Sequence, residues 1–129
     1  VKGKNLRVDR IVLSATKDQN KFHYQLVLAK VGNNRKFVKG DISLVVSGMQ
    51  EGIERSGLIK NGVWAAVEAN QEPFFASSSF KFRYFQELEG DIELPSGFIP
   101  SKIQVTATAL INRKKQTIDR SFDWELEKG

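Results

Sequence analysis

Hydrophobic and polar side chains alternate with a period of two residues along most of the chain. This alternation is typical of β-strands that bury one face and leave the other in water. The segments that show it are 22–29, 41–46, 80–84, 91–94, 102–111 and 118–126. In 102–111 the β-branched content argues against a helix. The pattern predicts about eight or nine strands.

The first strand changes phase partway along. Leu6 and Val8 share one parity, whereas Ile11 and Leu13 carry the other, so a β-bulge or a break is predicted near 9–10. Turn residues separate the remaining strands, at 17–20, 32–35, 48–52, 60–62 and 112–116. Asn61-Gly62 favours a type I′ turn.

These signals predict an all-β fold, an antiparallel two-sheet β-sandwich that is immunoglobulin-like (Ig-like) in architecture. A closed barrel is the alternative, because alternation alone does not reveal closure. Residues 65–69 fit a helical turn or a strand, and 71–78 read as a long loop. The 129 residues suit one domain spanning 1–129.

Composition narrows the chemistry. The chain has no Cys and one His, which excludes disulfides, thiolate metal sites, cysteine nucleophiles and multi-His metal centres. No phosphate-binding glycine loop, dinucleotide fingerprint or nucleophile elbow is present. We therefore expect no enzymatic activity, no cofactor and no metal.

The remaining acid–base candidates are His23 and the acidic run at 87–93. His23 reads as a partly exposed strand residue without an evident partner. The run Glu87, Glu89, Asp91 raises the idea of a glycosidase-type carboxylate pair, which requires a desolvated carboxyl group. We interpret it instead as a solvated strand face.

The charge balance is basic, with 20 Lys and Arg against 15 Asp and Glu, a net charge of +5. Two turns concentrate the positive charge. The candidate anion-binding residues are Arg35, Lys36 and Lys39 in one turn and Arg113, Lys114 and Lys115 in the other. The plainer interpretation is that they are solubilising loop residues.

Aromatic side chains offer a second kind of candidate. Phe74 and Phe75 follow Pro73 in the predicted loop, where they either form a protein-binding site or fold inward as a plug. In 80–85 the alternation predicts Phe80, Phe82 and Tyr84 inside the core and the intervening cations outside. That arrangement argues against a nucleic-acid stacking platform.

Four strings carry a resemblance to a known family: Gly40–Gly48, Phe82–Gly90, Leu94–Pro100 and the closing Phe122-Asp123-Trp124. Together they resemble an uncharacterised proteobacterial family of single-pass inner-membrane proteins with an N-terminal anchor, a coiled coil and a C-terminal β domain of unknown function. The resemblance implies that this chain, which starts at Val1, is the soluble C-terminal domain. It also implies a periplasmic location and dimerisation through an upstream coiled coil.

Two roles follow as expectations. The first is a non-enzymatic binding or assembly module of a bacterial cell-envelope protein, which engages another envelope protein through a sheet edge or the 70–79 loop. The alternative is a binder of polyanions (nucleic acid, lipid headgroups or lipopolysaccharide) that uses the basic hairpin tips. Nucleic acid is the less expected ligand, because acidic residues lie among the basic ones.

Overall fold

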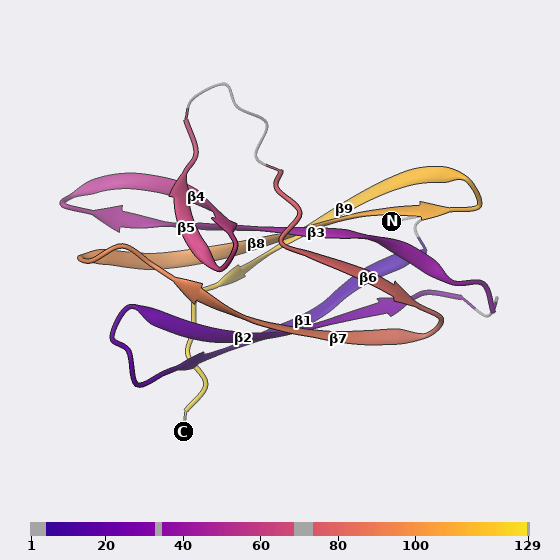
Figure 1. Ribbon diagram of the computed structural model, residues 1–129, viewed down its shortest axis with the longest axis horizontal. Helices are drawn as coiled ribbons and strands as arrows, with labels where there is room; N and C mark the ends of the chain where they lie inside the picture. The colour runs from indigo at the N-terminus through magenta and orange to yellow at the C-terminus, as the bar shows by residue number, and fades with distance from the viewer. Residues whose placement is uncertain (1–4, 33–34, 69–73, 129) are drawn as a thin grey trace.

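The computed structural model describes residues 5–32, 35–68 and 74–128 (Figure 1). Within these residues the chain is all-β, with no helix. Nine strands follow one another as β1 (Leu6–Ala15), β2 (Lys21–Lys30), β3 (Val38–Gln50), β4 (Ile53–Lys60), β5 (Val63–Ala66), β6 (Ser78–Phe82), β7 (Phe85–Glu93), β8 (Phe98–Ile111) and β9 (Lys114–Asp123). The predicted strand count is confirmed.

All nine strands belong to one sheet, in the order β1-β2-β7-β5-β4-β3-β8-β9, with β6 paired to β3 beside β4. The prediction of a purely antiparallel sheet is wrong at one point. β5 and β7 run parallel and meet at the single pair Val63 and Glu93. The sheet is therefore mixed. After β5 the chain continues through residues 67–77 into β6 and then into β7, and β7 runs in the same direction as β5.

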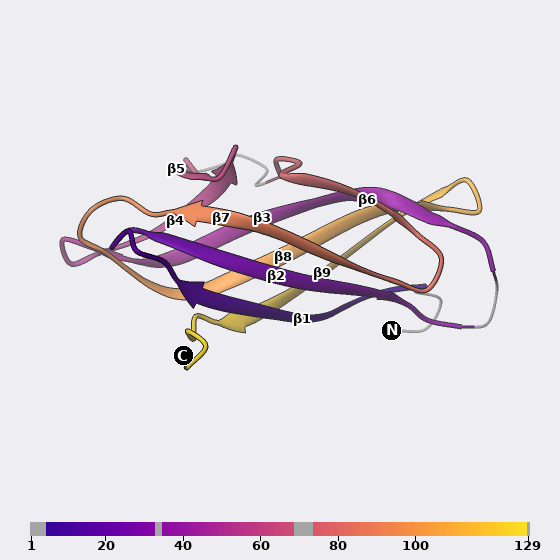
Figure 2. The same cartoon turned by 60° about the horizontal axis from the view of Figure 1, so that its bottom comes forward.

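The two ends of this strand path approach each other. The Arg120 side chain of β9 donates to the carbonyl oxygens of Val8 and Asp9 in β1, at 2.9 Å each. Further along, the Glu127 amide donates to the Leu13 carbonyl at 2.7 Å. The sheet is thus close to a barrel, and the predicted two-sheet Ig-like sandwich is not confirmed. In Figures 1 and 2, β1, β2 and β7 lie across from β3, β8 and β9.

The predicted bulge in β1 supplies the carbonyl oxygens that join β1 to β9. Pairing between β1 and β2 skips a residue between Val8 and Arg10, which confirms the phase change read from the sequence. A bulged residue leaves the ladder locally unpaired. Because Arg120 bonds the two carbonyl oxygens there, the irregularity becomes the contact point between the first and last strands.

The core is built from the faces that alternation assigned inward. The faces of β3 and β8 that point inward are buried: Ile42, Leu44, Val46, Ile103, Val105, Ala107, Ala109 and Ile111. Two assignments are wrong: Tyr84 is 58% exposed and Leu126 is 41% exposed. Tyr84 lies in the β6–β7 turn, where strand alternation stops, and Leu126 follows the end of β9.

Three hairpins use two-residue turns with left-handed backbone. Asn61 and Gly62 have φ of 51° and 80°, as predicted. The β3–β4 turn is Glu51-Gly52, so the predicted turn at 48–52 is shorter and Gly48 lies within β3. Of the loops predicted from sequence, residues 33–34 and 69–73 lie outside the described residues.

Position 48 requires glycine because the β8 backbone approaches it closely. Opposite it, β8 carries an extra residue, since Ser47 pairs with Lys102 while Gly48 pairs with Pro100. A Cβ at position 48 would lie 2.1 Å from the Ile99 carbonyl oxygen and 2.8 Å from the Pro100 Cα. Neither is a flexible side-chain atom.

We therefore expect Gly48→Ala to lower the free energy of unfolding by about 2–3 kcal/mol, because backbone must move to admit the methyl group. Urea denaturation measures this loss. Gly52→Ala is the control, since its Cβ meets nothing within 4 Å and only the φ of +77° is strained. A loss for Gly48→Ala no larger than for Gly52→Ala would contradict the steric explanation.

Candidate functional site

One end of the barrel gathers segments from across the sequence. It is formed by the end of β2, the start of β3, the β6–β7 turn and the β8–β9 turn (Figure 1, right). The Lys30 amide donates to the Tyr84 carbonyl at 2.9 Å, and the Lys30 Nζ donates to the Lys36 carbonyl at 2.6 Å. The Lys36 Nζ in turn reaches the Asn112 Oδ1 at 3.3 Å. These contacts tie the four segments together.

Positive charge collects at this end. The described residues 30–32, 35–40, 81–86 and 110–115, which we call the basic end, hold no Asp or Glu and nine cations: Lys30, Arg35, Lys36, Lys39, Lys81, Arg83, Arg113, Lys114 and Lys115. The rest of the chain has 11 basic and 15 acidic residues. The two basic turns predicted from sequence are therefore parts of one surface.

Apolar side chains protrude among these cations. Phe85 is 70% exposed, Leu110 58% and Phe37 49%. Phe37 lies between two cations, with the Lys81 Nζ 5.1 Å and the Arg83 Cζ 4.6 Å from its ring centroid. Cation–π contacts of this kind hold an exposed ring in place. The sequence analysis missed these residues, although Phe37 stands within the basic run 35–39.

The β8–β9 turn carries backbone strain at a cation. Asn112 and Arg113 have φ of 53° and 65°. The second of these positions in a type I′ turn favours Gly, because an L side chain in left-handed conformation costs about 1–2 kcal/mol. Strain of this size concentrates at functional positions. Arg113 thus keeps a guanidinium at the tip of the hairpin where Gly would relax the turn.

The paired aromatics after Pro73 lie differently from each other. Phe74 is 39% exposed and lines a hollow of about 570 Å³ together with Thr106, Thr108 and Asp119. Phe75 is half-buried, with its amide donating to the Ser43 Oγ at 3.1 Å. Of the two, only Phe75 is buried enough to resemble the predicted inward-folded plug.

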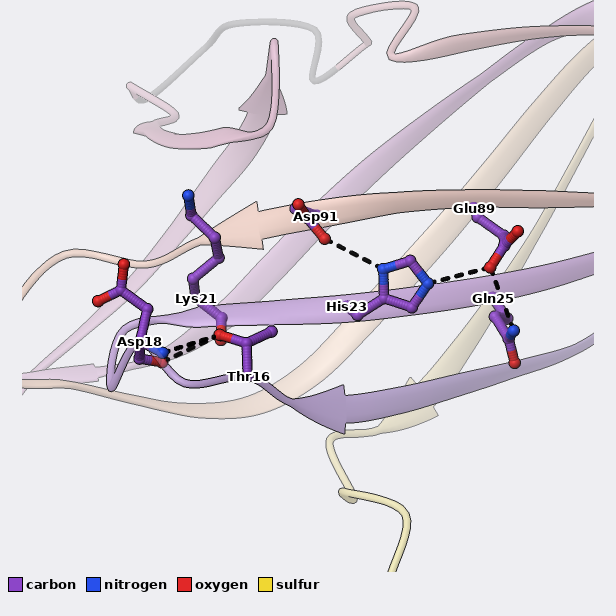
Figure 3. Close-up of polar contacts among 7 residues, drawn as sticks. All are labelled: Thr16, Asp18, Lys21, His23, Gln25, Glu89 and Asp91. Atoms are coloured by element: carbon purple, nitrogen blue, oxygen red, sulfur yellow. Dashed lines mark hydrogen bonds and ion pairs between the residues drawn. The ribbon is translucent and has the colours of Figure 1, made fainter. Parts of the chain in front are cut away.

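A second cluster lies on the outer face of β2 and β7. His23 stands between two carboxylates, with its Nδ1 3.0 Å from the Asp91 Oδ1 and its Nε2 3.1 Å from the Glu89 Oε1 (Figure 3). Glu89 also accepts from the Gln25 Nε2 at 3.2 Å. The sequence analysis found no partner for His23, because the β2–β7 register that places Asp91 opposite it joins residues far apart in the chain.

This arrangement links the outer faces of β2 and β7. The carboxylates raise the pKa of His23, first through the hydrogen bond that Asp91 accepts and next through the one that Glu89 accepts, while His23 lowers the pKa of Glu89. Glu87, Glu89 and Asp91 are all exposed, so none has the desolvation that a glycosidase acid needs. Among the described residues no three His, Cys, Asp or Glu side chains are grouped to hold a metal ion.

The chain matches the family of unknown function DUF6776 over residues 1–105, and it belongs to that family. The family carries no assigned activity in its description, so this membership agrees with a resemblance to an uncharacterised family and adds no chemistry. No curated protein matches the chain. Across 5–32, 35–68 and 74–128 there is no helix of the length and apolarity needed to cross a membrane.

We expect the His23 ring to titrate above 6.5, its ordinary pKa, in an NMR pH series. A raised folded pKa means that the stabilisation is complete below pH 6.5 and is lost as the pH rises through the folded value. The contribution of Glu89 to stability has the opposite pH dependence. Because its pKa is depressed, that contribution is present above its ordinary pKa of 4.5 and is lost as the pH falls through the lower folded value.

Variants separate the two carboxylates. Asp91→Asn should move the His23 pKa back toward 6.5 by more than Glu89→Gln does, because Asp91 makes the larger contribution. Glu87→Gln is the control, and it should leave the titration unchanged. A His23 midpoint at or below 6.5 in the unaltered chain would show that the ring is not held between the carboxylates.

Proposed function

We propose that this domain is a non-enzymatic binding module of a bacterial envelope protein and that its basic end rests on an anionic membrane surface. The observation that carries the proposal is the gathering of nine cations without an acid around protruding aromatic side chains. Each Lys or Arg close to such a surface contributes about 1 kcal/mol of attraction. Several such residues acting together hold a small domain at the membrane surface.

The exposed aromatics favour a membrane surface over nucleic acid. Aromatic rings beside cations suit the headgroup region, where a ring sits half in an apolar and half in a polar medium. Phe85, the first residue of β7, is 70% exposed, and the Lys81 and Arg83 cations lie over the Phe37 ring. A stacking platform for single-stranded nucleic acid uses open ring faces, whereas cations lie over the Phe37 ring.

Charge also orients the domain. With the basic end removed, the remaining chain has more acidic than basic residues. An anionic surface attracts one end and repels the other, so the long strands stand away from the membrane. Orientation of this kind comes from the charge distribution and not from the net charge of +5.

The start of the described chain fits this orientation. The Asn5 carbonyl accepts from the Val31 amide at 3.0 Å, which places Asn5 at the basic end. In our proposal the domain lies in the periplasm and follows an inner-membrane anchor and a coiled coil. A chain that arrives from the anchor would then meet the domain at the end that faces the lipid.

Protein docking is the second candidate, and the exposure of Phe74 favours it. Phe74 is 39% exposed and borders a hollow on the outer face of β8 and β9. Another envelope protein that bound there would bury an aromatic side chain. Binding of this sort is largely indifferent to salt and would be lost in Phe74→Ser.

We expect the chain to co-sediment with vesicles that contain phosphatidylglycerol and not with phosphatidylcholine vesicles. Arg113→Gly with Lys114→Gln should weaken this binding roughly 10- to 30-fold, because two cations leave the tip. The glycine also relaxes the strained turn, so lost binding is not a consequence of unfolding. Raising the salt concentration should weaken binding of the unaltered chain as well.

Lys17→Gln with Lys102→Gln is the matched control, since both lysines are exposed and lie outside the basic end. It removes the same charge and should bind nearly as well as the unaltered chain. Equal losses in both variants would mean that net charge alone drives binding. Binding that resists salt but disappears in Phe74→Ser would favour the protein-docking role instead.

A separate expectation concerns the apolar part of the contact. Phe85→Ser should weaken vesicle binding about tenfold, because burial of a Phe side chain in the interface is lost. Ile99→Ser is the control: Ile99 is 69% exposed but lies at the opposite end of β8. Intrinsic or attached-probe fluorescence reports the binding. Equal behaviour of the two variants would show that the basic end does not insert its aromatics.

A further inference from the structure

A groove crosses the outer face of the sheet over β6, β3, β8 and β9, next to the basic end. It has a volume of about 680 Å³. Lys39, Lys81 and Lys115 line one side, and Asp41, Ser79 and Thr108 line the other. No known phosphate-binding motif is needed to form it, because strand register alone places these side chains.

The three lysines lie in one row. Lys39 pairs with Lys81 across β3 and β6 and with Leu110 across β3 and β8, and Leu110 pairs with Lys115 in β9. Cross-strand partners share a face, and like charges placed directly opposite each other destabilise a sheet. Within the part of the chain that the structure describes, no ion pair involves these lysines. An anion bound between them would relieve this repulsion.

The opposite side of the groove is polar and partly acidic. Asp41 accepts a hydrogen bond from the Ser79 Oγ at 2.7 Å, and it pairs with Thr108 across β3 and β8. A carboxylate accepts from hydroxyl groups and repels phosphate oxygens. An anionic ligand that carries hydroxyl groups therefore has one orientation in the groove, with its phosphate on the lysine row and its hydroxyls toward Asp41.

We infer that this groove binds the phosphoglycerol headgroup of an anionic phospholipid. The inference rests on the proposed function, since Leu110 lines the groove and also protrudes at the end that meets the membrane. A lipid seated with its phosphate between Lys39 and Lys81 has its acyl chains free to remain in the bilayer beside Leu110. Specific headgroup binding is then added to the general attraction of the basic end.

The test is an NMR titration of the ¹⁵N-labelled chain with dihexanoyl-phosphatidylglycerol below its micelle concentration. We expect saturable shifts at the amides of 39–41, 79–81 and 108–110. Lys39→Gln with Lys81→Gln should weaken the affinity roughly 30-fold. Both lysines are exposed, so the variant keeps its fold, which the dispersion of the same spectra verifies.

Three comparisons complete the experiment. Lys17→Gln with Lys102→Gln should leave the affinity unchanged, and dihexanoyl-phosphatidylcholine should bind far more weakly. Inorganic phosphate that bound as tightly as the lipid would overturn the headgroup assignment, because the glycerol would then contribute nothing. Absent or scattered shifts with the lipid would overturn the site itself.

Vesicle sedimentation distinguishes this failure from that of the proposed function. If the chain binds phosphatidylglycerol vesicles but the soluble lipid gives no saturable shifts, the headgroup site is wrong and surface attraction stands. If the chain ignores the vesicles, the proposed function is wrong whatever the groove binds.

Discussion

The pairing of β3 with β8 is the constraint on which the rest of the structure depends. Its register runs from Lys39 opposite Leu110 to Gln50 opposite Phe98, so it extends nearly the whole length of the barrel. One face of this ladder supplies the centre of the core, with Ile42, Leu44 and Val46 fully buried. Because the side-chain period is two, the same register sends Lys39 outward. A shift by one residue would bury the lysine and expose the core together.

Alternation predicted the parts of the fold that depend on neighbours along the chain. Strand number, the bulge near Asp9 and the type I′ turn at Asn61-Gly62 follow from local rules and are confirmed, as are the inward faces within the strands of the core. Closure did not follow, because it depends on contacts such as Arg120 with Val8, which lie 112 residues apart. The parallel β5–β7 pair was missed for the same reason. Tyr84 shows a different limit of the sequence prediction. It lies in a turn, where the alternation of inward and outward side chains no longer applies.

The sequence predicted only part of the basic end. The two basic turns stand out as charge runs, but Lys81 and Arg83 lie in what reads as an ordinary alternating strand. Only the β3–β6 register, which pairs Lys81 with Lys39, brings this segment to the basic end. His23 is a similar case: its carboxylate partners lie 66 and 68 residues further along the chain and meet it only through β2–β7 pairing. Sequence spacing identifies side chains of one strand face, whereas a surface made by four strands requires the order of those strands.

The single residue pair between β5 and β7 has a consequence for how the barrel fluctuates. A seam closed at one position opens at a smaller free-energy cost than a ladder of nine or ten pairs. This weak seam lies near Val63, at the ends of β5 and β7 remote from the Asn112 turn. Transient separation of the strands at this seam would therefore occur at a distance from the lysine row.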